Sequence, residues 1–285
     1  MNPGEPIGGP LPGLGPPSPP IPPAVRALAE ELNTHLPLRQ GDQRIVDPRF
    51  VIYLGAGEDP HFTVVQRLRL GPGELPQVVA EVRRLLAARG RRGATWELGP
   101  SSQPAALGAE LRALGLRPDP LESEVAGMVL MQPPESPDFA ASTTIAVERV
   151  ESAARLRQVQ VIFSGCFGTP LGDSDPRRDF ARYQASPSWR SYIALEGGQP
   201  IAAADATFTD EAVVLSGGAT LPALRRRGAY RALIAARWRD AVARGTPILV
   251  TQAGHMSRPI LTRLGFTVVA KVQVFLDEMR DPEPR

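Results

Sequence analysis

The most constraining feature of this sequence is an order of elements, strand, helix, strand, helix and strand, that occurs twice along its 285 residues. Apolar residues two apart predict the strands, and apolar residues three and four apart predict the helices. In the first half, a strong helix is expected from Leu75 to Leu86, with Gly90 at its left-handed end. The other segments expected there are strands at 50–54, 62–70, 95–98 and 124–130 and a helix at 105–114.

The second half repeats this order after three strand-like segments, 191–195, 201–208 and 212–216. An apolar stripe from Tyr230 to Val242 then predicts a helix. Short phrases recur as well, since Ala88-Arg89-Gly90 resembles Ala243-Arg244-Gly245 and Leu114-Gly115-Leu116 resembles Leu264-Gly265-Phe266. We infer a tandem duplication. The alternative is that any two α/β halves look alike at this level.

The predicted fold class is α/β with two similar domains, each a twisted mixed sheet flanked by helices. Ten Pro and five Gly among the first 23 residues predict an extended tail. From Val25 to Leu36 a helical pattern begins, with Glu30 and Glu31 on its polar side. The expected divisions are a tail at 1–23, a first domain at 24–133, a Pro-rich linker at 134–141 and a second domain at 142–280.

Charge and composition exclude several classes of protein. The 32 basic and 30 acidic residues nearly cancel, so no nucleic-acid partner is expected. One Cys and three scattered His predict neither a disulfide framework nor a metal site. No segment has the apolar length of a membrane span, and the N-terminus lacks the pattern of a secretory signal. The chain is therefore expected to be cytoplasmic and free of membrane.

The segment that carries chemistry runs from Arg225 to Tyr230, between a strand and the second-half helix. A helix that begins in this way leaves its first backbone N–H groups unpaired, with the positive end of the helix dipole behind them. Gly228 would let an anion approach the main chain, and the three arginines add positive charge. The turn therefore predicts a phosphate site. The alternative is a solvated arginine cluster at the start of an ordinary surface helix.

Here the sequence resembles the GNAT superfamily of N-acetyltransferases, whose acetyl-CoA signature is Arg or Gln, two residues, Gly, one residue, then Gly or Ala. Arg225 and Gly228 match this signature, and Tyr230 departs from it. Ser257 to Phe266 also resembles the helix and Gly-Phe ending of that family. The resemblance covers roughly 145–277. The first half has no matching turn, so it is expected to bind no CoA.

The resemblance implies that acetyl-CoA is the acyl donor and that a small-molecule or peptide amine is the acceptor. It leaves the oligomeric state open, a homodimer included. Leu261 stands where the family usually has a Tyr as general acid, and Gly254 stands where it often has an Asn. These departures favour the alternative of a non-catalytic CoA-binding regulatory protein. The residues implied to bind acetyl-CoA are Ala219, Thr220, Leu221, Arg225, Arg226, Arg227, Gly228, Ala229, Tyr230 and Ser257.

An amine must be neutral to attack a thioester, so a carboxylate that accepts its proton is expected. Asp205 is the candidate, because it interrupts an apolar strand in which Asp is disfavoured. Alternation places it on one face with Ile201, Ala203 and Thr207. The alternative is a carboxylate that lies on a solvent-facing strand or caps a bulge. Trp189 and Phe167 are expected on the acceptor side. Lone Cys166 is expected to be a small buried apolar residue rather than a nucleophile.

Overall fold

The structure of the chain is a computed structural model that describes residues 19–133, 144–168, 171 and 175–279. The predicted linker, 134–141, and most of the predicted tail lie outside these residues. The helices of the first half are α1 (Pro23–Glu30), α2 (Leu32–His35), α3 (Leu75–Ala87) and α4 (Leu107–Ala113). Its strands are β1 (Gln43–Val46), β2 (Val51–Leu54), β3 (Thr63–Gln66), β4 (Gly93–Leu98), β5 (Arg117–Pro118) and β6 (Glu124–Leu130).

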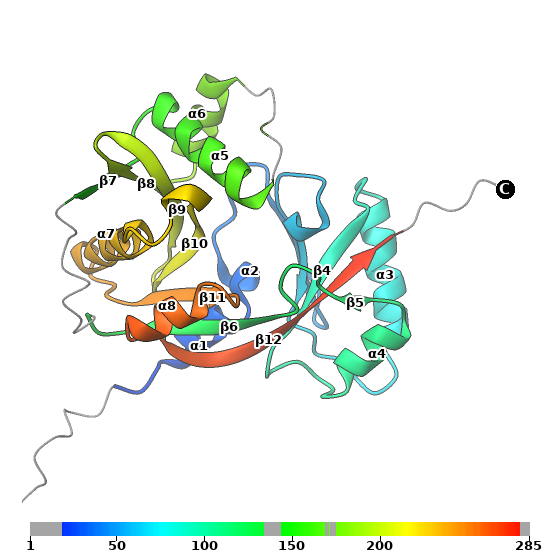
Figure 1. The fold of residues 1–285 in the computed structure, drawn as a ribbon. Coiled ribbons are helices and arrows are strands. Elements are labelled where there is room, and N and C mark those ends of the chain that lie inside the picture. Colours follow the sequence, from blue (N-terminus) through cyan, green and yellow to red (C-terminus); the bar gives the residue numbers. More distant parts are fainter. Residues whose placement is uncertain (1–18, 134–143, 169–170, 172–174, 280–285) are drawn as a thin grey trace, which may run out of the picture.

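The second half follows the same scheme with longer strands (Figure 1). Its helices are α5 (Ala153–Phe167), α6 (Pro176–Gln184), α7 (Ala229–Ala243) and α8 (Arg258–Arg263). Its strands are β7 (Ile145–Arg149), β8 (Trp189–Glu196), β9 (Gln199–Phe208), β10 (Val213–Thr220), β11 (Leu249–Ala253) and β12 (Thr267–Glu278). The helices and strands expected from the periodicity are present, whereas β1, β5, β7, α5 and α6 were not anticipated.

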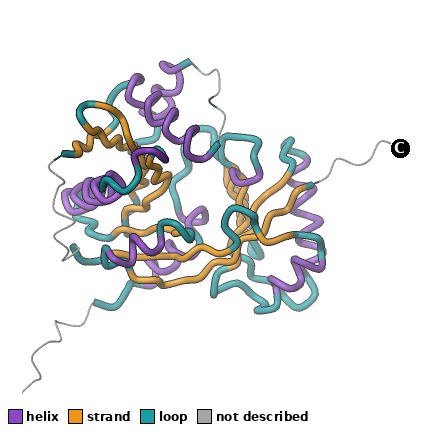
Figure 2. Tube along the Cα trace, viewed as in Figure 1, coloured by secondary structure: helices purple, strands orange, loops and turns teal. Residues whose placement is uncertain are grey.

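Among the described residues, the two halves share one mixed sheet of twelve strands. Its order is β1-β2-β3-β4-β12-β6-β11-β10-β9-β8-β7, with β5 paired to β12. The predicted mixed α/β architecture is confirmed, although the two expected sheets are continuous. The last strand of each half lies next to the other half, because β6 pairs with β11 and β12 pairs with β4. Figure 2 shows β6 and β12 running side by side across the molecule, between its two groups of helices.

Four apolar clusters hold this arrangement together. In the first half, α3 and α4 pack against β2, β3 and β4 around the buried Trp96. In the second half, α7 and α8 cover one face of the sheet, and α5 covers the opposite face of β9. None of the described helices combines the length and apolarity needed to cross a membrane.

Helix α1 covers the region where β6, β11 and β12 lie together. Gly127 on β6 permits this close approach, because an added Cβ would lie 2.5 Å from the Ala29 carbonyl oxygen. The polar side of the predicted helix is not exposed to solvent, since Glu30 and Glu31 are both buried. Glu30 accepts hydrogen bonds from the Ser101 amide and hydroxyl, and Glu31 forms an ion pair with Arg69. Partners distant in sequence thus make a polar helix face an interior one.

Two strand boundaries differ from the sequence prediction. The strand expected at 62–70 ends at Gln66, because Arg67 has a φ of 56°, which takes the backbone out of the extended region. The strand expected to end at Ser216 continues to Thr220, past a shift in register between Ser216 and Ala219. A register shift of this kind is a β-bulge, which bends a strand and is common beside functional sites.

The glycine phrases that recur in the sequence end equivalent helices. Gly90 and Gly245, at φ values of 68° and 77°, follow α3 and α7. Gly115 and Gly265, at 90° and 88°, follow α4 and α8. In all four places the next residue donates its N–H to a carbonyl five residues earlier, which is the hydrogen bond of a Schellman C-cap. The repeated phrases therefore encode the same helix ending in both halves.

Candidate functional site

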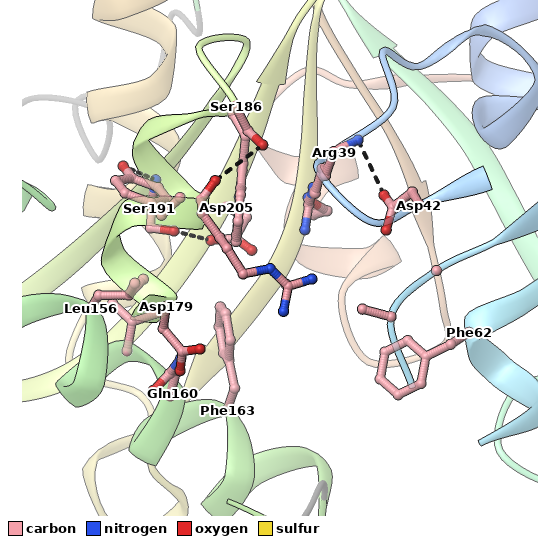
Figure 3. A pocket seen from close by; sticks show the side chains of 18 of the residues that line it. Arg39, Asp42, Phe62, Leu156, Gln160, Phe163, Asp179, Ser186, Ser191 and Asp205 are labelled. Atoms are coloured by element: carbon pink, nitrogen blue, oxygen red, sulfur yellow. Dashed lines mark hydrogen bonds between the residues drawn. The ribbon is translucent and has the colours of Figure 1, made fainter. Parts of the chain in front are cut away.

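A cleft of about 580 Å³ lies between the two halves (Figure 3). The first half contributes residues from the α2–β1 loop, from β2 and from the segment around Phe62. The second half contributes α5, α6 and the central part of β8, β9 and β10. A cleft of this size falls within the range of roughly 300 to 1,000 Å³ that is usual for small-molecule sites.

A row of three polar residues crosses the floor of the cleft. Asp205 on β9 lies opposite Ser191 on β8 and opposite Ser216 on β10, and all three line the cleft. Ser191 Oγ donates a 2.6 Å hydrogen bond to Asp205 Oδ1 (Figure 3). Asp205 is 6% exposed, so it is not the solvent-facing carboxylate that the sequence left as an alternative.

The electrostatic surroundings of Asp205 are mixed. Burial raises the pKa of its carboxyl, because a charge loses hydration in the interior. The Arg39 guanidinium and the Ser191 hydroxyl favour the ionised form and lower this pKa. Trp189 Nε1 makes no hydrogen bond of normal geometry, yet it lies close enough to act in the same direction. Asp205 is thus a buried carboxyl whose charge depends on groups from both halves.

One part of the predicted face is wrong. Ala203 packs with α5 in the cluster on the cleft side, but Ile201 packs in the cluster on the α7 side. The β8–β9 pairing shifts between Ala194 and Leu195, and this shift leaves Ile201 as the extra residue. An extra residue reverses the alternation of side chains along a strand. The strict alternation assumed from the sequence therefore fails at this end of β9.

The bulged part of β10 borders a gap in the sheet. Strands β10 and β11 pair only through Val213 and Val214 among the described residues, and no register pair joins them beyond that point. Gly217, at a φ of 62°, lies inside the bulge. The edge of β10 from Ser216 to Thr220 is consequently without a strand partner on the β11 side. An edge of this kind can hydrogen-bond an extended ligand.

The arginine turn lies directly after this edge, at the start of α7. Gly228 is the N-cap residue at a φ of 92°, and no side chain caps the helix. Arg225, Arg226 and Arg227 are exposed around it. Arg227 forms a 2.7 Å ion pair with Glu196, and Arg225 Nε donates to the Thr220 carbonyl oxygen at 3.3 Å. The uncapped amides of the first turn and the guanidiniums make this end of α7 electropositive.

The other predicted residues lie around the same gap. Ala219 is buried, and the Leu221 N–H donates to the Ile201 carbonyl oxygen and is therefore already paired. Tyr230 lies over Gly218, where an added Cβ would be 2.7 Å from its ring. Burial raises the pKa of the Tyr230 phenol, and the Ser257 hydroxyl opposes this change. The side chain of Tyr230, on α7, thus lies between Gly218 of β10 and Ser257 at the start of α8.

The structure also gives the positions of Trp189, Phe167, Cys166 and Leu261. Trp189 and Phe167 both line the cleft. Burial raises the pKa of the Cys166 thiol, which disfavours a nucleophilic thiolate. Leu261 is 1% exposed and belongs to the core of the second half. Within the described ranges, no group of three or more His, Cys, Asp or Glu is arranged to hold a metal ion.

No family model matches the sequence, and no curated protein matches it either. Solved structures, however, match the fold over most of the chain. A GCN5-related N-acetyltransferase from Kribbella flavida is 20% identical, with a TM-score of 0.65 over 89% of this chain and 95% of that one. A GCN5-related N-acetyltransferase from Sphaerobacter thermophilus is 16% identical, with a TM-score of 0.60 over 82% and 78%.

A third structure, a tandem GNAT protein from the clavulanic acid biosynthesis pathway, is 13% identical, with a TM-score of 0.54 over 82% of this chain and 79% of that one. The chain has a tandem GNAT fold. At these identities the similarity concerns the fold, and the tandem organisation inferred from the repeated phrases is consistent with it.

Within this tandem GNAT fold, the sequence analysis missed the polar partners of Asp205 and the contribution of the first half. Ser191 and Ser216 are polar positions in neighbouring strands, a signal that becomes useful only once the strand register is known. Arg39 had no signal of its own, because it lies in a loop far from Asp205 in the sequence. The cleft therefore depends on contacts that the fold creates.

Proposed function

We propose that the chain is an acetyl-CoA-dependent N-acetyltransferase whose second half binds the acyl donor and whose cleft binds the acceptor amine. The observation that carries this proposal is the position of Asp205, a buried carboxylate opposite Ser216, where β10 enters its bulge beside the gap. A base opposite β10, the open edge of β10 and the electropositive helix start that follows β10 thus lie around one gap in the sheet.

The residues around the gap fit acetyl-CoA. The uncapped start of α7, with Gly228 and the exposed Arg225 and Arg226, suits a diphosphate. The unpartnered edge of β10 from Ser216 to Thr220 suits the pantetheine arm, which carries amide groups. The Thr220 carbonyl already accepts from Arg225, and the Leu221 amide is paired with β9. We therefore expect the bulge residues to supply most of the main-chain contacts.

In this proposal, the amine attacks the thioester carbonyl directly. The protein holds the two groups together and aims N–H donors at the oxygen that becomes negative. Asp205 accepts the proton that the amine loses, directly or through a water molecule, while Ser191 Oγ holds its carboxylate in place. The CoA thiolate leaves and takes a proton from solvent.

The second candidate, a non-catalytic CoA-binding regulatory protein, is favoured by the core position of Leu261, which offers no general acid. Two measurements separate the candidates. Calorimetry with acetyl-CoA is expected to show binding in both cases. Release of CoA thiol in the presence of an amine panel is expected only for the enzyme, so binding without turnover by any amine would favour the regulator.

A further inference from the structure

Arg39 enters the acceptor cleft from the first half, on the loop between α2 and β1. This loop is fastened to the second half, since the Gln40 N–H donates to Ser186 Oγ at 3.4 Å and Arg182 Nη2 donates to the Gln40 carbonyl oxygen at 3.2 Å. The Arg39 N–H also donates to Asp42 Oδ2, as does the Tyr53 hydroxyl (Figure 3). The backbone that carries Arg39 is therefore held in position.

The Arg39 side chain is held as well. Its guanidinium carbon lies 3.9 Å from the centroid of the Trp189 ring, so the planar group stacks on the indole. Trp189 in turn meets Tyr183 edge to face at 5.1 Å. A stacked guanidinium keeps the N–H donors along its edges available, in the fork geometry that matches a carboxylate.

Among the residues that the structure describes, these donors have no anionic partner. No carboxylate of the described residues lies within ion-pair distance of Arg39, whereas Arg49, Arg69, Arg83 and Arg149 each have one. Arg39 does act on Asp205, whose ionised form it favours. The cleft therefore holds an unpaired cation and a buried carboxylate close enough to influence each other without direct contact.

The remaining walls of the cleft are largely apolar. Phe163, Phe167 and Leu171 line it from the second half, and Phe62 lines it from the first. Phe167 is 56% exposed, and Leu171 and Phe62 are each 37% exposed. Large apolar side chains that gather at a concave surface are typical of a ligand site rather than of plain surface.

We propose that the acceptor is a free α-amino acid with an apolar side chain, bound by its carboxylate to Arg39 with its amino group beside Asp205. The inference rests on the proposed acetyl transfer. A cation and a carboxylate that line one cleft complement the two charged groups that an α-amino acid carries on one carbon. The apolar walls receive the side chain, and the limited volume favours a small molecule over a folded protein substrate.

The reaction balances without a further reagent. The amino group binds as an ammonium and loses one proton, to solvent, before it attacks. Its nitrogen then forms the new C–N bond as the C–S bond of the thioester breaks. The second nitrogen proton passes to Asp205, and the CoA thiolate takes up a proton from solvent. The products are an N-acetyl amino acid and free CoA.

The test compares two pairs of acceptors that differ only in the carboxylate, L-phenylalanine with phenethylamine and L-leucine with isoamylamine. Initial rates of thiol release are measured over a range of pH, and kcat/KM is compared on the plateau above the acidic limb of each variant, so that a change in the ionisation of Asp205 does not enter the comparison. The wild-type chain is expected to prefer each amino acid by about 10- to 100-fold in kcat/KM, as a charged hydrogen bond would provide. Arg39→Met is expected to remove this preference by raising KM for the amino acids and to leave the amines within a few-fold.

The matched control is Arg244→Met. Arg244 also stacks on an aromatic ring, 4.1 Å above Phe208, but it does not line the cleft. It is expected to keep the wild-type preference. Equal losses for amino acids and amines in Arg39→Met would assign Arg39 to tuning of Asp205 alone and overturn the inference. A wild-type chain that shows no preference for the carboxylate would also overturn it.

The inference and the proposed function fail in different ways. If the chain acetylates amines but not amino acids, the function stands and the inference is wrong. If no amine is acetylated, the proposed function is wrong. Saturation-transfer NMR with L-phenylalanine and phenethylamine then shows whether Arg39 binds a carboxylate. If the wild-type chain binds L-phenylalanine and Arg39→Met does not, Arg39 is a carboxylate-binding residue. If both compounds bind equally, or neither binds, it is not.

Discussion

The two halves build the same strand–helix–strand unit, but they end its first strand differently. In the second half, β10 runs eight residues through a bulge, and α7 begins after Gly228, with three arginines before it. In the first half, β3 ends after four residues at Gln66, and α3 begins after Glu74. The Glu74 carboxylate accepts a 2.6 Å hydrogen bond from the Gly71 N–H.

This difference teaches that topology alone does not make an anion site. At α7 the helix dipole, the free amides and the arginines all favour an anion, whereas before α3 a carboxylate of the protein already stands in the loop. The strand beside β3 differs as well. Strand β2, with the sequence Val51-Ile52-Tyr53-Leu54, carries no acidic residue like Asp205 on β9. The first half thus lacks the features that suggest chemistry in the second, and it contributes Arg39 to the shared cleft instead.

The first test compares the two turns directly. Gly228→Glu places a carboxylate at the start of α7, where it would repel a diphosphate, so the affinity for acetyl-CoA is expected to fall by about 100-fold or more. Calorimetry and a melting curve measure affinity and folding. The matched control is Gly73→Glu, because Gly73 also has a positive φ, 78° against 92°, and also precedes a helix.

Gly73→Glu is expected to leave acetyl-CoA affinity unchanged, with a loss of thermal stability similar to that of Gly228→Glu. Unchanged affinity in a folded Gly228→Glu chain would remove the site from α7. An equal loss of affinity in Gly73→Glu would mean that both halves bind the ligand, and the contrast between them would be void.

The next effect concerns Asp205. Asp205→Asn keeps the shape of the side chain and removes its basicity, so turnover is expected to fall by the roughly 10²- to 10⁴-fold usual for a general base. Acetyl-CoA affinity is expected to remain, since the carboxylate lies in the cleft and not at the α7 turn. Wild-type turnover in Asp205→Asn would make the carboxylate structural.

The pH profile sharpens this prediction. Asp205 must be ionised to accept a proton, and burial raises its pKa, so the acidic limb of kcat/KM is expected at a higher pH than an ordinary Asp would give. Arg39 favours the ionised form, so Arg39→Met is expected to move the limb to a still higher pH. Asp205→Asn is expected to lose this limb, and an identical limb in the variant would assign it to another group.

The smallest effect tests the region that the halves build together. Glu97 on β4 accepts a hydrogen bond from Gln66 and has Gln252 of β11 as a further partner. Burial raises its pKa to about 7. The pKa of Glu97 is thus higher in the folded chain than in the unfolded one. The contribution of protonated Glu97 to the free energy of unfolding is therefore fully present below about pH 4.5 and is lost as the pH rises through about 7.

Glu97→Gln mimics the protonated side chain at every pH. It is therefore expected to raise the free energy of unfolding by about 2 to 3 kcal/mol at pH 8 and to change it little at pH 4. Urea denaturation at the two pH values measures this difference. A variant that is less stable than wild type at pH 8 would show that the ionised carboxylate is the favoured form in the fold.

Much of the local structure was predictable, for identifiable reasons. The helices α3 and α7 follow from apolar residues three and four apart, and the recurring glycines mark helix ends because they adopt positive φ values. The buried face of α7 departs from the predicted stripe, since Val242 is exposed and Arg237 is buried. The predictions failed where a distant partner intervened. Glu30 lies on the polar side of its helix, but it is buried because Ser101, on the loop after β4, donates a hydrogen bond to it. Ile201 changed sides because of a register shift with β8.

The sequence by itself determined the local elements, the glycine helix ends and the basic turn before α7, because these depend on neighbours a few residues away. Only the tertiary structure decided that β6 and β12 would cross between the halves and that Arg39 would stack on Trp189. Pairing between distant strands depends on the apolar area and hydrogen bonds that the whole sheet completes, and no local pattern encodes that choice. The cleft arises at the contact between two similar halves, and its residues come together only once both have folded.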